Sequence, residues 1–317
     1  MFEGFANVWT IVARSRDVPP GVLRPVRVAG ERVVLFRAPD GRAAALIDRC
    51  PHRGAALSLG TLRGGEIECP FHGWRFDSGG ANRAVPWNPD ARCAALGATP
   101  VPVRELAGML WLHTGQEPAH EPEPCDSLRR PGVRVTYDSV LWRCHWTRAM
   151  ENMLDVPHLP FVHRRTIGRD LAAAAPRTME TAWAETAWGA RIDGRIEGRE
   201  RPIALNFLYP NAMELVIDPP GRLLRVMAVC LPEGPRATRM IFLSIRSFAR
   251  SRLLDPLFSH GNRRIAREDQ AVIESSDPPE VPEPGVERSV RSDAPTLAFR
   301  KLYFERLKGS SAALAPA

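Results

Sequence analysis

The sequence predicts an α+β protein in which an all-β domain precedes a second domain built from strands and helices. Short apolar runs separated by turn residues fill the first third of the chain, and longer strand-like runs with helical segments fill the rest. A segment rich in proline and glutamate lies between the two parts. The length of 317 residues and the apolar content of 44% suit two domains, each with its own core.

The first domain is expected over residues 1–115. Its strand-like runs are NVWTIVA, RPVRVAG, ERVVLFRAPDG, RAAALID and GMLWLHTG. The dipeptides Asp40-Gly41 and Gly64-Gly65 are typical of hairpin turns, which join neighbouring antiparallel strands. Together these features indicate a small all-β domain.

The segment 116–132, QEPAHEPEPCDSLRRPG, is expected to link the two domains. It shows no apolar periodicity and is rich in proline and glutamate, which is typical of an exposed linker. At the far end of the chain, residues 309–317, GSSAALAPA, are expected to form a disordered tail.

The second domain is expected over residues 133–308. Its strand-like runs include VRVTYD, IALNFLYP, AMELVID, LLRVMAVCLP and RMIFLSIRSF. Helices are expected around 147–156, 252–275 and 294–308. Consecutive strands with helices before and after them predict an antiparallel sheet with helices packed on one side.

The charge and hydropathy of the chain exclude two classes of protein. The net charge of +7 would suit nucleic-acid binding, but the arginines are scattered rather than gathered in one basic run. No apolar run approaches the ~18 residues that a membrane span needs. The N-terminal sequence MFEGFANVWTIVARSRD lacks the features of a signal peptide, so a cytoplasmic protein is expected.

Two short loops each pair one cysteine with one histidine. CPHRG contains Cys50 and His52, and CPFHG contains Cys69 and His72. Two thiolates and two imidazoles suit a tetrahedral zinc. They also suit a [2Fe-2S] cluster in which both cysteines bind one iron and both histidines bind the other. We favour the cluster, because the prolines and glycines keep each loop tight and let backbone N–H groups approach the sulfides.

A second histidine pair lies in ENMLDVPHLPFVH, which holds His158 and His163. Two imidazoles and one carboxylate on one face of a ferrous ion leave positions open for O₂ and a substrate. A spacing of five residues does not match a whole number of helical turns. However, Pro157 and Pro160 predict a break in the helix that brings the two rings together.

Both motifs resemble those of the Rieske non-heme iron oxygenases, the aromatic ring-hydroxylating oxygenases and their monooxygenase and demethylase relatives. CPHRGAALSLGTLRGGEIECPFHGWRFD is similar to their cluster loops, and the pattern N-x-x-D-x-x-H-x(4)-H, which begins at Asn152, is similar to their mononuclear-iron motif. Respiratory Rieske proteins carry an extra cysteine in each loop, where this chain has Gly54 and Trp74. The resemblance covers the whole chain except the tail.

The resemblance implies a Rieske [2Fe-2S] domain followed by a helix-grip (START-like) catalytic domain with a mononuclear Fe(II). The cluster ligands would be Cys50, His52, Cys69 and His72. The iron ligands would be His158, His163 and a carboxylate. We expect Asp293, because the family's ligand aspartate lies at such a helix start, with Asp269 and Glu268 as alternatives. Asp155 would connect a cluster histidine to an iron histidine by hydrogen bonds.

The implied activity is that of a terminal oxygenase, which uses O₂ to hydroxylate, dioxygenate or demethylate a small organic substrate. Electrons would come from an NAD(P)H-dependent flavin reductase, directly or through a ferredoxin, because the chain has no glycine-rich dinucleotide fingerprint. The resemblance also implies a homotrimer that pairs the cluster of one subunit with the iron of the next. The alternative is a Rieske-START protein that carries electrons, a lipid or a small molecule without oxygenation.

Overall fold

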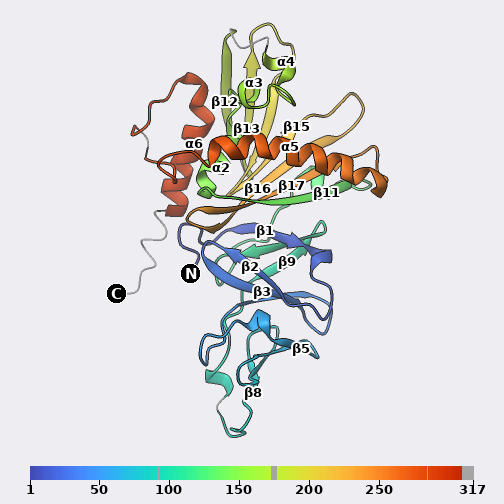
Figure 1. Ribbon diagram of the computed structural model, residues 1–317, viewed down its shortest axis with the longest axis vertical. Helices are drawn as coiled ribbons and strands as arrows, with labels where there is room; N and C mark the ends of the chain where they lie inside the picture. The colour runs from blue at the N-terminus through green and yellow to red at the C-terminus, as the bar shows by residue number, and fades with distance from the viewer. Residues whose placement is uncertain (92, 173–176, 284, 309–317) are drawn as a thin grey trace. The chain divides into compact units, whose positions relative to one another are not determined.

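The computed structural model describes residues 1–308 except 92, 173–176 and 284, and it forms two compact units. The first unit comprises Met1–Pro122 and the second begins at Glu123, so the boundary falls inside the predicted linker, residues 116–132 (Figure 1). The expected tail lies outside the described residues. No described helix is both long enough and apolar enough to span a membrane.

The described part of the first unit is built from three small antiparallel sheets, as its strand runs predict. Their strand orders are β1-β10-β9, β2-β3-β4 and β5-β6-β7-β8. The strands are β1 (Trp9–Arg14), β2 (Arg24–Val28), β3 (Glu31–Arg37), β4 (Ala43–Ile47), β5 (Thr61–Arg63), β6 (Glu66–Glu68), β7 (Arg75–Phe76), β8 (Asn82–Ala84), β9 (Val103–Leu106) and β10 (Met109–His113). Short 3-10 turns, η1 (Ser15–Asp17), η2 (Leu57–Leu59) and η3 (Cys93–Ala95), lie between them.

The core of the first unit extends to the two cysteine-histidine loops. Cys50 follows β4 and Cys69 directly follows β6, and both thiols are buried in one cluster with Phe36, Leu46 and Ile67. The strand ends therefore fix where each loop starts, and the core fixes which way each thiol points.

The second unit contains one seven-stranded antiparallel sheet of order β11-β17-β16-β15-β14-β13-β12. Its strands are β11 (Arg134–Trp142), β12 (Met179–Thr186), β13 (Gly189–Ile196), β14 (Ile203–Leu208), β15 (Ala212–Val216), β16 (Leu224–Gly234) and β17 (Ala237–Arg246). The first strand of the unit pairs with the last, so β11 lies at the edge of the sheet beside β17.

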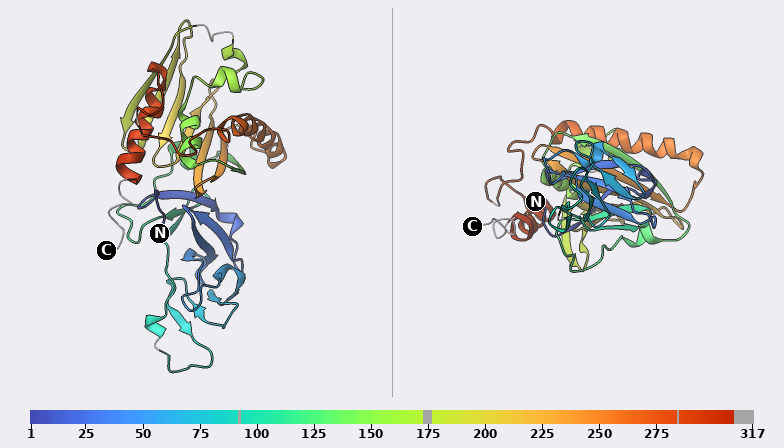
Figure 2. Two further views of the ribbon diagram at one scale, coloured as in Figure 1. Left: turned by 60° about the vertical axis from the view of Figure 1, so that its left-hand side comes forward. Right: turned by 90° about the horizontal axis from the view of Figure 1, so that it is seen from below.

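Three main helices pack on this sheet, as the sequence predicts. The helix α5 (Asp255–Ile273) lies along β11 and β17, α2 (Trp146–Leu154) packs on β15 and β16, and α6 (Ala294–Leu302) packs on β12 (Figures 1 and 2). The helix α2 contacts both of the others. Shorter helical turns complete the unit: α1 (Asp126–Arg129), α3 (Leu159–Val162), α4 (Arg169–Ala172), η4 (Arg252–Leu254), η5 (Arg291–Asp293) and the π-helical η6 (Tyr303–Lys308).

A buried ion cluster anchors the start of α5 to the sheet. Asp255, the first residue of the helix, accepts hydrogen bonds from Arg134 on β11 and from Arg246 on β17, the latter at 2.6 Å. The side chain of Arg246 is fully buried and stacks on Phe258, with its guanidinium carbon 4.0 Å from the ring centroid. The hydrogen bonds from Arg134 and Arg246 hold the pKa of Asp255 well below its usual value.

Asp255→Ala should destabilise the second unit by about 3 kcal/mol at pH 7, because it leaves the buried Arg246 charge without its counter-ion. The pKa of Asp255 is lowered by folding, so the carboxylate stabilises the protein above its usual pKa of 3.8 and loses that effect as the pH falls below it. Urea unfolding at several pH values should therefore show a difference from wild type that shrinks below about pH 4. A constant difference down to pH 2 would contradict the assignment.

Candidate metal centres

His158 and His163 flank the single helical turn α3. The helix α2 ends at Leu154 because Asp155 adopts an extended conformation (φ −80°, ψ 123°), and α3 then starts directly after His158. His163 directly follows the last residue of α3, and the two ring centroids lie 5.2 Å apart. The predicted break in the helix is confirmed, and it places both imidazoles on the same side of the turn.

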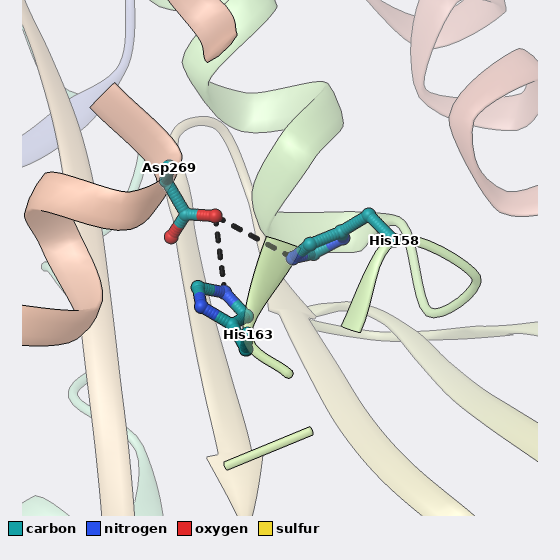
Figure 3. A group of neighbouring side chains, drawn as sticks. All are labelled: His158, His163 and Asp269. Carbon is teal, nitrogen blue, oxygen red and sulfur yellow. Dashed lines mark ion pairs between the residues drawn. The ribbon is translucent and has the colours of Figure 1, made fainter. Parts of the chain in front are cut away.

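The carboxylate that joins them belongs to Asp269 on α5. Its Oδ1 lies 3.0 Å from His163 Nε2 and 3.6 Å from His158 Nε2 (Figure 3). Ligand atoms of the three residues all lie within 4.8 Å of one another, and no other group of three or more potential ligands in the described chain converges in this way. The geometry is that of two imidazoles and one carboxylate converging on one point.

Asp293, the carboxylate expected from the sequence, does not reach this group. The aspartate lies at the start of α6 as expected, but its Oδ2 accepts the backbone N–H of Val290 at 2.8 Å. The preceding residue is tied to the edge strand β12 through the hydrogen bond from Thr181 to the Ser292 carbonyl. Asp293 therefore stabilises a helix start, and the alternative Asp269 takes its place beside the histidines.

Each of the two imidazoles has a further carboxylate beside its other nitrogen. Glu268 Oε2 lies 2.8 Å from His163 Nδ1 and also accepts the Thr166 hydroxyl at 2.6 Å. Asp155 Oδ2 lies 3.3 Å from His158 Nδ1 and accepts the backbone N–H of the same histidine. Carboxylates at these positions fix the tautomer and orientation of metal-binding histidines.

One buried polar atom at this centre fits a metal. Asp269 Oδ1 is buried and has no partner with hydrogen-bond geometry among the described residues. An unpaired buried carboxylate oxygen is costly, and a cation bound between it and the two imidazole Nε2 atoms would offset that cost. Burial lowers the pKa of His163, but Asp269 and Glu268 outweigh this and raise the pKa above its usual value. The site thus attracts positive charge.

A cavity of about 110 Å³ opens next to these residues. Its floor is formed by the sheet residues Leu205, Met213, Leu215, Val226, Ala228 and Phe242. The strands β14, β15, β16 and β17 thus each contribute apolar residues to the cavity.

The two cysteine-histidine loops of the first unit have the same backbone hydrogen bonds. Gly54 N–H donates to the Cys50 carbonyl and Gly73 N–H to the Cys69 carbonyl. The cysteine N–H groups donate to the carbonyls of Ala55 and Trp74. Both glycines have a positive φ, +72° and +70°, which only glycine adopts without strain. The tightness expected of these loops is therefore a property of their backbones.

The loops separate the thiols from the imidazoles. Cys50 and Cys69 are buried, whereas His52 and His72 are exposed with ring centroids 4.6 Å apart. These four residues form no group of three whose ligand atoms meet around one point. A tetrahedral zinc needs such a point. A two-iron cluster, with the thiolates at one end and the imidazoles at the other, fits the arrangement better.

Two further contacts of the loops are not evident from the motif. The His52 ring stacks on Trp74 at 4.5 Å with an interplanar angle of 2°. Burial raises the pKa of the Cys50 thiol to about 11, while the backbone N–H groups of His52 and Arg53 act against this. Those N–H groups point at the sulfur and would stabilise the thiolate of a cluster ligand. All six cysteines of the chain are free.

Comparison with known proteins identifies both domains. Residues 8–99 match the Rieske [2Fe-2S] domain, and residues 142–308, more than half of the chain, match the vanillate O-demethylase oxygenase C-terminal domain. The chain belongs to the family of Rieske oxygenases, oxidoreductases whose cofactors are a Rieske [2Fe-2S] cluster and a mononuclear iron.

Two curated relatives illustrate the range of the family. The 5,5'-dehydrodivanillate O-demethylase oxygenase subunit of Sphingobium sp. (strain NBRC 103272 / SYK-6) is 28% identical over 67% of this chain and 53% of that protein. Chlorophyllide a oxygenase of Oryza sativa subsp. japonica is 25% identical over 84% of this chain and 50% of that protein. The chain thus spans about half the length of these relatives.

Solved structures show the same fold along the whole chain. Dicamba monooxygenase bound to dicamba has a TM-score of 0.80 at 23% identity, covering 97% of this chain and 98% of that one. NdmA of Pseudomonas putida CBB5 has a TM-score of 0.78 at 23% identity, covering 96% and 92%. The predicted α+β architecture, with a Rieske domain and a following catalytic domain, is confirmed.

Replacing the two candidate carboxylates should distinguish them. Asp269→Ala should lose the mononuclear iron, because it removes the only carboxylate that faces both imidazole Nε2 atoms in the described chain, while the cluster spectrum stays unchanged. Asp293→Ala should keep both metals and cost about 1 kcal/mol of stability through the lost helix-start hydrogen bond. Metal analysis and unfolding midpoints measure both effects. Loss of iron from the Asp293 variant alone would restore the first expectation.

Glu268→Gln should weaken iron binding about 10- to 100-fold, the usual effect of losing a carboxylate behind a metal-binding histidine. Glutamine keeps the length of the side chain and can still accept the Thr166 hydroxyl, so folding should be preserved. The dissociation rate of iron into a chelator measures the effect. Glu274→Gln, at the residue that directly follows the same helix, is the matched control, and an equal loss in both variants would contradict a specific role for Glu268.

Proposed function

We propose that this chain is a terminal oxygenase component, which uses O₂ and electrons from an NAD(P)H-dependent reductase to hydroxylate or oxidatively demethylate a small organic substrate. The observation that carries the proposal is the convergence of His158, His163 and Asp269 beside an apolar cavity. A chain that only transferred electrons or bound a lipid would not need three converging metal ligands there.

The residues divide into two ligand sets. Cys50, His52, Cys69 and His72 would hold the Rieske cluster, which supplies one electron at a time. The mononuclear iron would be held by His158, His163 and Asp269, and when bound it supplies the positions at which O₂ is activated. In this assignment the carboxylate ligand of the iron is Asp269, whereas the sequence led us to expect Asp293.

The protein groups around the iron ligands orient them and exclude water. The Glu268 carboxylate lies beside Nδ1 of His163, and the Asp155 carboxylate lies beside Nδ1 of His158. The Nε2 atoms of both rings therefore face Asp269. The aliphatic floor of the cavity keeps bulk water from the reacting atoms, which strengthens every charge interaction there. Substrate held against this floor would lie next to the open positions of the metal.

Asp155 is proposed to connect two copies of the chain. Its carboxylate lies beside His158, yet a quarter of the side chain is exposed, at 26%. We propose that it accepts a hydrogen bond from a cluster histidine of a neighbouring copy in a homotrimer, because a head-to-tail contact of this kind closes into a ring. A flavin reductase, with or without a ferredoxin, would dock at the exposed His52 and His72. The free cysteines are in keeping with a cytoplasmic location.

The decisive experiment is O₂ uptake with NADH and a surrogate reductase. Purified protein should be red-brown, show a Rieske-type EPR signal, and consume O₂ faster when a substrate is added from a panel of methoxy- and methylated aromatics, alkaloids and sterols. Colourless protein with one zinc per chain would overturn the oxygenase proposal. If both metals are present, but O₂ uptake does not rise with substrate and no product forms, the electron-transfer or small-molecule-binding alternative is favoured.

Asp155→Asn should bind both metals and still be reduced at the cluster, yet turn over at a few per cent of wild type or less. The amide keeps the size of the side chain but removes the charge that orients the His158 imidazole. Single-turnover kinetics on pre-reduced enzyme measure the rate at which O₂ and substrate oxidise the cluster. Cluster oxidation at the wild-type rate with normal product yield would show that Asp155 is no bridge.

A further inference from the structure

The cavity beside the iron ligands is apolar almost everywhere. Its polar lining groups are Asn152, Asp155, His158, His163, Asn262 and Asp269, and all but Asn262 belong to the metal site or to the helix end that leads into it. Asn152 Nδ2 is buried and has no hydrogen-bond partner among the described residues, so the lining holds one uncharged donor. The amide of Asn262 is already engaged, because its Nδ2 donates to Ser244 at 2.9 Å and to Asp138 at 3.2 Å. The rest of the lining is aliphatic, apart from one phenylalanine.

No described residue that lines this cavity is an arginine or a lysine. The undescribed stretches of the second unit, 173–176, 284 and 309–317, contain only Ala, Pro, Gly, Ser and Leu, so they supply no charged side chain either. This is notable in a chain with 43 basic residues. A substrate carboxylate inside the cavity would find no cationic side chain to pair with.

The buried arginines of the second unit are held by other partners. Arg225 on β16 pairs with Asp218 at 2.7 Å and with Glu214 at 3.0 Å, while Val226 and Ala228 of that strand line the cavity. Arg148 pairs with Glu287 at 2.7 Å. These arginines are therefore committed to structural ion pairs.

An anion would also meet unfavourable electrostatics. Burying a carboxylate without a partner costs several kcal/mol, which far exceeds the benefit of covering one small ring. Asp155 and Asp269 place two acidic side chains in the cavity wall, and a bound divalent iron would balance their charge without leaving an excess for the substrate. The wall thus selects against negative charge.

We infer that the part of the substrate enclosed beside the iron is uncharged and largely apolar, and no larger than about one six-membered ring. A volume of about 110 Å³ is somewhat smaller than the ~150 Å³ of an engineered apolar cavity that binds benzene. The inference rests on the proposed function, since it takes this cavity as the substrate site, and it adds the chemical class of the group that enters. The exposed Arg164 and Arg165 lie outside the cavity lining, so an acidic group that stays in solvent is compatible with it.

Three probes of similar shape test the charge preference on protein loaded with both metals: toluene, benzoate and benzylammonium. Calorimetric titration should give a Kd for toluene at least 100-fold lower than for benzoate, because only the uncharged ring leaves no unpaired charge. Benzylammonium binding tests whether Asp155 and Asp269 make the cavity favour a cation over the uncharged ring when iron is bound. Benzoate or benzylammonium binding within tenfold of toluene, or no toluene binding at millimolar concentration, would overturn the inference.

Two substitutions on one strand locate the binding site. Ala228→Phe should abolish toluene binding, because the new ring fills the cavity, while both metals and the cluster spectrum are retained. Met227→Leu, which points to the opposite face of β16, should leave binding unchanged. Ala228→Leu is the milder variant if the phenylalanine prevents folding, with at least a tenfold loss expected. Unchanged toluene binding in a folded, metal-loaded Ala228 variant would place the ligand elsewhere and refute the inference.

These binding measurements are independent of turnover, so the two proposals can fail separately. If acids bind in the cavity and stimulate O₂ uptake, the oxygenase proposal stands and the inference of an uncharged group falls. If toluene binds as expected but no member of the substrate panel yields product, the oxygenase proposal falls and the charge preference of the cavity stands.

Discussion

Burial of the Asp269 carboxylate beside two imidazoles is the constraint around which the second unit is arranged. The side chain is 4% exposed, and its Oδ1 has no hydrogen-bond partner in the described chain. A charged group stays buried there only if α5 is held rigidly against the sheet. The Asp255 ion cluster holds the helix at its first residue. The same requirement explains why α2 stops at Leu154 and why a one-turn helix presents both histidines toward α5.

Local spacing was sufficient to propose Cys50, His52, Cys69 and His72 as cluster ligands and His158 and His163 as iron ligands, because each cysteine-histidine pair lies within one loop and the two histidines flank one helical turn. The carboxylate ligand could not be chosen this way. Asp293 and Asp269 both lie more than a hundred residues beyond His158, and only tertiary packing decides which of them meets it. A signal was present: Asn262, Ala266 and Asp269 form a buried stripe along α5. An acidic residue on the inward face of an amphipathic helix is unusual enough to single out.

The fold class was predictable, because strand alternation and turn dipeptides are local signals. The order of the seven-stranded sheet was not, since β11 pairs with β17 across more than ninety intervening residues. Contacts behind the ligands, such as Glu268 on His163 and Trp74 on His52, were also invisible, because they depend on side-chain directions that spacing alone does not give. Sequence patterns therefore proposed the metal-binding histidines and cysteines, and the structure added the side chains that surround them.

The two cysteine-histidine loops tie the directions of their thiols and imidazoles to two glycines. Backbone hydrogen bonds and the left-handed Gly54 and Gly73 close each loop. The buried thiols lie at the inner end, while the imidazoles remain open to solvent. Any other residue at position 54 or 73 would have to hold a left-handed backbone at a cost of about 1 kcal/mol, so a side chain that never touches the cluster could still turn its ligands away.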